Sequence, residues 1–336
     1  MIGVIIAHMN TIFLLSPYRF LLMSALIAVF AFGNALAQDP RNPTMTSGYN
    51  DSEKEALYAR FNDYRRNPNP EQQRFAYPTA KDYLRRWGGE TNAGTKEIQR
   101  FVIEYERAMH GRELLAAYNG GNFAKVFEMG RSAVKADPED FNALSLLVEA
   151  AHDSAVAGKT GFIAEATDYA RRAIKLLEGG KVSKPDPFKS MEVARGFLNF
   201  ALGNFVKDEN PVEAAAAYEK AVKSDSPYHT DPAAYHRLGA SILKGEFAQL
   251  SNEYNQKYGG QKESAEQAAM FKRINHLVEQ TIDAYARAVA LSTKPEQKDA
   301  REKILTQLTA IYKNFHNNSD AGLSELIATV LSKPLP

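Results

Sequence analysis

The stretch NPVEAAAAYEKAVKSDSP (residues 210–227) decides the fold, because it sets small side chains along one helix at spacings of four and three. Ala214, Tyr218 and Ala221 mark this pattern, and the pair Leu202-Gly203 precedes it. Helices approach closely only where the side chains between them are small. The stretch therefore predicts the second helix of a closely packed helix pair.

The same pattern occurs three more times in the chain. Each copy carries an alanine equivalent to Ala221, and these repeat alanines are Ala133, Ala173 and Ala288. The copies are YNGGNFAKVFEMGRSAVKADPED (118–140), FIAEATDYARRAIKLLE (162–178) and TIDAYARAVALSTKP (281–295). Stacked repeats bury apolar surface that one repeat cannot bury alone. Because no run of alternating strand residues occurs, we predict an all-α protein.

These four copies resemble the tetratricopeptide repeat family over residues 110–316. The resemblance implies a right-handed α-solenoid of helix pairs that binds proteins or peptides, in a secreted or periplasmic version with irregular repeats. The family repeats every ~34 residues, whereas the repeat alanines here are 40, 48 and 67 residues apart. The Gly- and Pro-rich EGGKVSKPDPFK (178–189) explains part of the middle excess.

The largest excess lies in YHRLGASILKGEFAQLSNEYNQKYGG (235–260) and the residues that follow it. One apolar stripe runs through this stretch to Tyr254, and a matching stripe runs from Phe271 to Tyr285. Gly259-Gly260 separates the two stripes, and Ser264-Ala-Glu-Gln267 is a capping box before the second one. We therefore predict an elongated helical hairpin at about 233–292. With about 15 extra residues in each arm, it would project about 20 Å from the array. The alternative is that the extension, residues 244–273, packs back onto the array.

The N-terminal sequence indicates export from the cytoplasm. Residues 1–37 combine one basic residue, a 13-residue apolar run and a small-x-small ending at Ala37, which is typical of a cleaved signal peptide. A retained membrane anchor is the alternative, and translation could start at Met9 instead of Met1. We expect cleavage after Ala37 and a periplasmic or secreted protein without a membrane span. The remaining regions are expected to be a flexible linker (38–50), an N-terminal helical region (51–109) and a C-terminal capping helix (317–336).

Charge and composition exclude several classes of protein. The formal net charge is +1. Residues 1–37 contain one basic residue, Arg19, and no acidic residue, so their removal leaves equal numbers of basic and acidic residues. A nucleic-acid partner is not expected, because it would require a basic excess. The sequence has no cysteine, which excludes disulfides, thiolate metal sites and a cysteine nucleophile.

We find no catalytic or cofactor motif in the sequence. The seven histidines form no metal-ligand pair, and no phosphate-binding glycine loop is present. Ser132 and Lys135 match an S-x-x-K motif without its partner motifs, which indicates an accidental surface match. No metal, cofactor or enzymatic activity is therefore predicted.

Any binding site is expected on the concave surface that the first helix of each pair would line. The family's basic clamp for a carboxylate has no matching set of residues here. A protein- or peptide-binding scaffold is the main functional hypothesis, and a helical-repeat protein that binds a small molecule or glycan is the alternative. An enzyme with a site among the N-terminal helices or in the hairpin is a third. The partner and the oligomeric state stay open. The candidate binding residues are Glu149, His152, Asn199, His236, Arg237 and Lys244.

Overall fold

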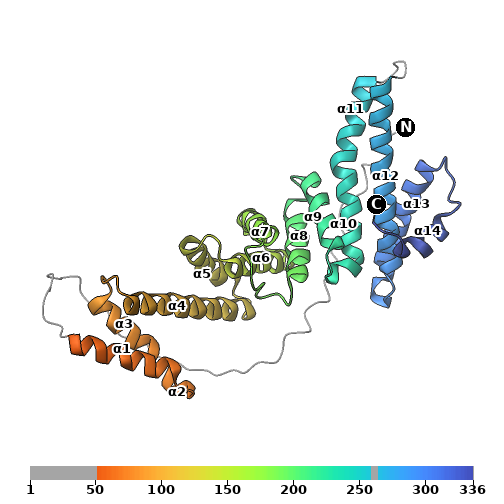
Figure 1. Ribbon diagram of the computed structural model, residues 1–336. Helices are drawn as coiled ribbons and strands as arrows, with labels where there is room; N and C mark the ends of the chain where they lie inside the picture. Colours follow the sequence, from red (N-terminus) through yellow and green to blue (C-terminus); the bar gives the residue numbers. More distant parts are fainter. Residues whose placement is uncertain (1–50, 259–263, 336) are drawn as a thin grey trace. The chain divides into compact units, whose positions relative to one another are not determined.

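The computed structural model describes residues 51–258 and 264–335 (Figure 1). All regular structure in these ranges is helical, as predicted, and they contain no strand. The expected signal peptide (1–37), the linker (38–50) and the Gly259-Gly260 turn lie outside the described residues. None of the described helices combines the length and the apolarity that a membrane span requires. The described residues divide into two compact units, one up to residue 112 and one from residue 113 onward.

The first unit is a small helical domain with an aromatic core around Phe61, Tyr83 and Trp87. Its helices are tied together by tyrosine hydroxyls that donate hydrogen bonds to glutamates of α4. Tyr58 bonds Glu97 at 2.5 Å and Tyr77 bonds Glu106 at 2.7 Å. The helices are α1 (Asp51–Arg66), α2 (Pro70–Gln73), α3 (Ala76–Trp87) and α4 (Ala93–Asn119). The predicted boundary at residues 109 and 110 and the boundary between the two units at 112 and 113 both fall inside α4, which therefore contributes residues to both units.

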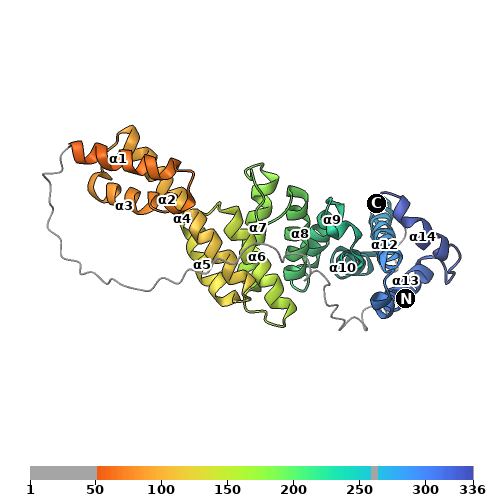
Figure 2. The same cartoon turned by 90° about the horizontal axis from the view of Figure 1, so that it is seen from below.

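In the second unit, each helix from α5 to α9 packs against the next one in the sequence (Figures 1 and 2). The side chains that these helices share form one continuous core. The predicted loop at 178–189 separates α7 from α8. The helices are α5 (Phe123–Ala136), α6 (Phe141–Val156), α7 (Ile163–Glu178), α8 (Met191–Val206) and α9 (Pro211–Lys223).

Two helix pairs of this unit share the same glycine–tyrosine contact. A methyl group placed on Gly203 of α8 would lie 2.7 Å from the ring of Tyr218 on α9. A methyl group on Gly239 of α10 (Pro232–Ile242) would lie 2.6 Å from the ring of Tyr285 on α12 (Ala265–Leu291). Both distances are too short for a carbon–carbon contact, so only glycine fits at these two positions.

The elongated stretch after Ile242 is helical with one irregularity. A π-helical segment, Leu243–Phe247, joins α10 to α11 (Ala248–Tyr258). Gly245 interrupts the helical dihedral angles there, and a methyl group on it would lie 3.0 Å from the backbone nitrogen of Val212 on α9. This close approach at a π-bulge explains why the helix changes geometry where a repeat helix would end.

The second arm of the hairpin is α12, which packs along α11 (Figure 1). Ser264 caps α12 as predicted, because its hydroxyl accepts from the backbone nitrogen of Gln267 at 3.2 Å. The Gln267 side chain does not complete the predicted capping box. It donates instead to the Tyr254 hydroxyl at 3.1 Å, and so links the two arms.

The C-terminal part is less helical than the predicted capping helix over 317–336. The α13 helix (Lys298–Phe315) packs on α12, as does the short α14 (Leu323–Thr329). A 3₁₀ turn, Val330–Ser332, follows α14, and the chain then becomes extended at Lys333 (φ −104°, ψ 149°). We call residues 332–335 the tail segment.

Candidate functional site

The structure connects some of the predicted binding residues through α8. His152 of α6 lies beside the ring of Phe200 on α8, with ring centroids 6.1 Å apart. The guanidinium carbon of Arg237 on α10 lies 4.8 Å from the centroid of the same ring, within cation–π range. Arg237 also donates to the side-chain oxygen of Asn204 at 2.7 Å. His152 and Arg237 therefore belong to one half-buried strip across α6, α8 and α10.

The other predicted residues on α8 and α10, and in the segment after α10, have different surroundings. Asn199 is only 2% exposed, and its amide donates to the backbone oxygen of Arg195 at 2.9 Å. His236 bonds Gln307 of α13 at 3.0 Å, and burial lowers its pKa, which favours the neutral ring. Lys244 is exposed and forms an ion pair with Asp208 at 2.9 Å.

Glu149 of α6 is the one carboxylic acid among the predicted residues, and the fold shifts its pKa strongly. Burial raises its pKa to about 8, and the nearby charge of Asp153 adds to this effect. Asp153 lies one helical turn further on and accepts a hydrogen bond from the Tyr118 hydroxyl at 2.9 Å. Glu149 itself has no hydrogen-bond partner within the described residues. The fold therefore keeps this side chain protonated at neutral pH.

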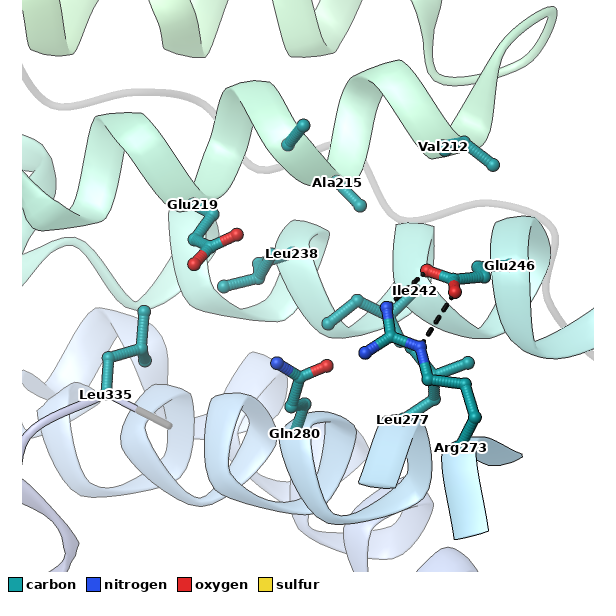
Figure 3. Close-up of a pocket in the computed structure, with 11 residues that line it drawn as sticks. Val212, Ala215, Glu219, Leu238, Ile242, Glu246, Arg273, Leu277, Gln280 and Leu335 are labelled. Atoms are coloured by element: carbon teal, nitrogen blue, oxygen red, sulfur yellow. Dashed lines mark hydrogen bonds and ion pairs between the residues drawn. The ribbon is translucent and has the colours of Figure 1, made fainter. Parts of the chain in front are cut away.

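A cleft between α9, α10 and α12 was not predicted from the sequence (Figure 3). Its volume is about 190 Å³. Aliphatic side chains of all three helices form its walls, and the polar groups lie around them. The apolar lining residues are Val212, Ala215, Ala216, Leu238, Ile242, Leu277 and Leu335; the polar ones are Glu219, Glu246, Arg273 and Gln280.

The two ends of this cleft have different chemistry, as Figure 3 shows. At one end, Arg273 of α12 and Glu246 of the π-helical segment form a bidentate ion pair with two contacts of 2.9 Å. At the other end lies Leu335 of the tail segment. The cleft thus has an ion pair at one end and a leucine of the chain's own tail segment at the other.

Arg287 of α12 holds the tail segment by its backbone. This arginine is 5% exposed and forms an ion pair with Asp283 at 2.6 Å. Its guanidinium donates to the carbonyl oxygens of Lys333 and Pro334, both at 2.8 Å. The ion pair orients the guanidinium, and the two carbonyl contacts do not depend on the side chains of the tail.

A similar arginine–glutamate ion pair joins α5 to α7 and α7 to α9. Arg131 of α5 binds Glu165 of α7 at 2.8 Å, and Arg171 of α7 binds Glu213 of α9 at 2.8 Å. Each arginine lies two residues before a repeat alanine, and each glutamate lies eight residues before the repeat alanine of the next copy. We call these two ion pairs the arginine–glutamate ladder. The members of each pair are 34 and 42 residues apart in the chain.

The ladder is interrupted at the cleft. The residue two positions before the repeat alanine Ala221, where an arginine would continue the ladder, is Glu219. The residue eight positions before the repeat alanine Ala288, where a glutamate would continue it, is Gln280. Among the described residues, Glu219 forms an ion pair with Lys223 on its own helix, at 2.5 Å, and with no residue of another helix. Gln280 makes no hydrogen bond to another described residue. Two signals in the sequence could have indicated the cleft. They are the separation of 67 residues between Ala221 and Ala288, and the presence of Glu219 and Gln280 at the two ladder positions.

No group of three or more His, Asp or Glu in the described ranges could hold a metal ion. The cleft combines an apolar wall with polar groups at its margin, which suits the binding of a peptide side chain. No model of a known protein family matches this sequence, and no curated protein matches it either.

Proposed function

We propose that this protein binds an extended segment of a partner protein in the cleft between α9, α10 and α12. One observation carries the proposal: the chain's own tail segment is held there as a bound peptide would be. Arg287 holds its backbone at the Lys333 and Pro334 carbonyls, and Leu335 lines the end of the cleft opposite the Arg273–Glu246 ion pair. Main-chain contacts provide affinity and a side-chain pocket provides preference, as in other modes of peptide recognition.

The proposed role is that of a non-enzymatic scaffold. We place the cleft in a right-handed solenoid of tetratricopeptide-like helix pairs. The paired contacts of Gly203 with Tyr218 and of Gly239 with Tyr285 support equivalent helix pairs. The arginine–glutamate ladder supports a regular stacking of α5, α7 and α9.

The proposal also places the protein in the periplasm or outside the cell. The signal-peptide pattern of residues 1–37 supports this location. Amino-terminal sequencing of the protein purified from its host is expected to start at Gln38. A chain that retains residues 1–37, or that fractionates with the cytosol, would contradict the location and leave the cleft proposal intact.

Peptide binding is tested with a labelled peptide of residues 329–336. The receptor is the full-length chain carrying Leu335→Asp, because an aspartate in the apolar cleft would release the tail segment. Fluorescence anisotropy is expected to show saturable binding to this variant and weaker apparent binding to the wild-type chain. In the wild-type chain only the fraction with an open cleft can bind, which lowers the apparent affinity.

The matched controls test whether the cleft is the binding site. Ala216→Trp in the Leu335→Asp chain adds a large side chain to the cleft and should weaken binding about tenfold, which corresponds to ~1.4 kcal/mol. Ala124→Trp in the same Leu335→Asp chain replaces an exposed alanine of α5 and should leave peptide binding unchanged. The proposal fails if the peptide does not bind, or if a peptide with aspartate in place of Leu335 binds equally well.

A further inference from the structure

The interrupted ladder indicates which side chain the cleft lacks. At the two earlier positions of the ladder, an arginine of one helix forms an ion pair with a glutamate of the next helix in the ladder, from α5 to α7 and from α7 to α9. At the cleft, the arginine position holds Glu219 and the glutamate position holds Gln280. Two acceptor groups therefore line the cleft, and no arginine of the described residues forms an ion pair or hydrogen bond with either of them.

The other charges around the cleft do not replace this missing arginine. Arg273 is occupied by the bidentate contact with Glu246 at the opposite end. Lys223 pairs with Glu219 from one turn further along α9, and both side chains are largely exposed, at 51% and 41%. Exposed pairs at this spacing are worth only about 0.3–0.5 kcal/mol. A ligand can therefore replace Lys223 at small cost.

We infer that the preferred ligand of the cleft is a peptide with an arginine next to its apolar anchor, and that this arginine binds Glu219 and Gln280. The inference rests on the proposed function and specifies its ligand. A guanidinium group suits this pair of acceptors, because its planar set of N–H donors can bind a carboxylate and an amide oxygen together. A lysine offers a single point charge and should serve less well.

The tail segment has no arginine that could bind Glu219 and Gln280. This is expected if the tail segment occupies the cleft only until a partner peptide replaces it. Its basic residue, Lys333, is exposed and contributes its backbone carbonyl to Arg287. It forms no ion pair with Glu219 among the described residues. A partner peptide that adds the arginine contact should therefore displace the tail segment.

An arginine scan of the 329–336 peptide tests the inference with the full-length Leu335→Asp chain. Each peptide position except that of Leu335 is replaced in turn by Arg, Ala or Glu. At one position or two adjacent ones, arginine is expected to bind about tenfold tighter than alanine. Glutamate at the same position is expected to bind more weakly than alanine, because it faces the Glu219 carboxylate.

The ratio of arginine-peptide to alanine-peptide affinity is then compared between receptors. Adding Glu219→Gln is expected to bring this ratio close to one, and Glu219→Arg with Gln280→Glu should do the same by rebuilding the ladder pair. Glu213→Gln, which breaks the ladder at another junction, is the matched control and should keep the ratio. Circular dichroism confirms that each variant is folded.

The outcomes separate this inference from the proposed function. If no peptide binds, both fail. If the parent peptide binds and arginine improves binding at no position, the inference fails and the proposed function stands. If the arginine advantage persists in Glu219→Gln, the inference also fails, because the arginine then binds elsewhere.

Discussion

Glu149 is the residue whose protonation the fold changes most clearly. Its pKa is about 8 in the folded chain, whereas its ordinary value is 4.5. Between these pH values the folded chain keeps a proton that the unfolded chain releases. The free energy of unfolding should therefore fall as the pH rises from about 4.5 to about 8, and this contribution should be constant above that range.

The variant Glu149→Gln should remove this part of the pH dependence, because its amide stays neutral. At pH 8 to 9 we expect the variant to be more stable than the wild type by about 2 kcal/mol. This is less than the free energy that corresponds to the full pKa shift, because the side chain is partly exposed. At pH 4.5 the two proteins should be similar. Urea unfolding at several pH values measures the difference, with the exposed Glu128→Gln as control. Parallel pH profiles for Glu149→Gln and the wild type would contradict the prediction.

At the scale of elements, the hairpin arm α11 differs from the helices of the core. Only Ser251 and Tyr258 are buried in α11, and this helix packs chiefly on α12 and the π-helical segment. By contrast, α8 buries ten of its residues. Helices with few buried contacts open locally at low free-energy cost. We therefore expect the arm to open locally more readily than α8.

Hydrogen exchange should detect this difference. Backbone amides of α11 and of the first turns of α12 should exchange at least about tenfold faster than those in the middle of α8, which corresponds to ~1.4 kcal/mol in local opening. Mass spectrometry of peptides from the full-length chain measures both regions in one experiment. Equal protection of α11 and α8 would show that the arm is stabilised by contacts outside the described set.

At the scale of the whole molecule, the two units have separate cores. The only tryptophan of the sequence, Trp87, lies in the core of the first unit. The core of the second unit starts with Leu114 and extends to Val330. Tryptophan fluorescence therefore reports the first unit, whereas far-UV circular dichroism reports mostly the larger helical second unit.

Chemical unfolding should give different midpoints for these two signals, because the chain does not unfold as a single two-state domain. The variant Leu144→Ala, in the second core, is expected to cost about 2–5 kcal/mol and to shift the dichroism transition alone. The variant Val102→Ala, in the first core, should shift the fluorescence transition. Coincident transitions that move together in both variants would contradict the prediction.

The sequence by itself determined the helical fold and the close contacts within its repeats. Helical periodicity and small residues act over three or four positions, so the alanines and glycines of each copy could be identified from the sequence. The same local signals predicted the two arms of the hairpin and the cap at Ser264. They did not predict the π-helical segment, because it depends on the close approach of Gly245 to α9.

Only the tertiary structure decided which side chains meet. Asn199 and Arg237 were equally plausible binding residues by position, and yet one is buried against its own helix and the other lies over Phe200. The cleft depends on helices from three separate parts of the chain and on Leu335. Periodicity fixes the face of a helix, whereas the partner of that face depends on the rotation and spacing of packed helices, and these are set by the whole core.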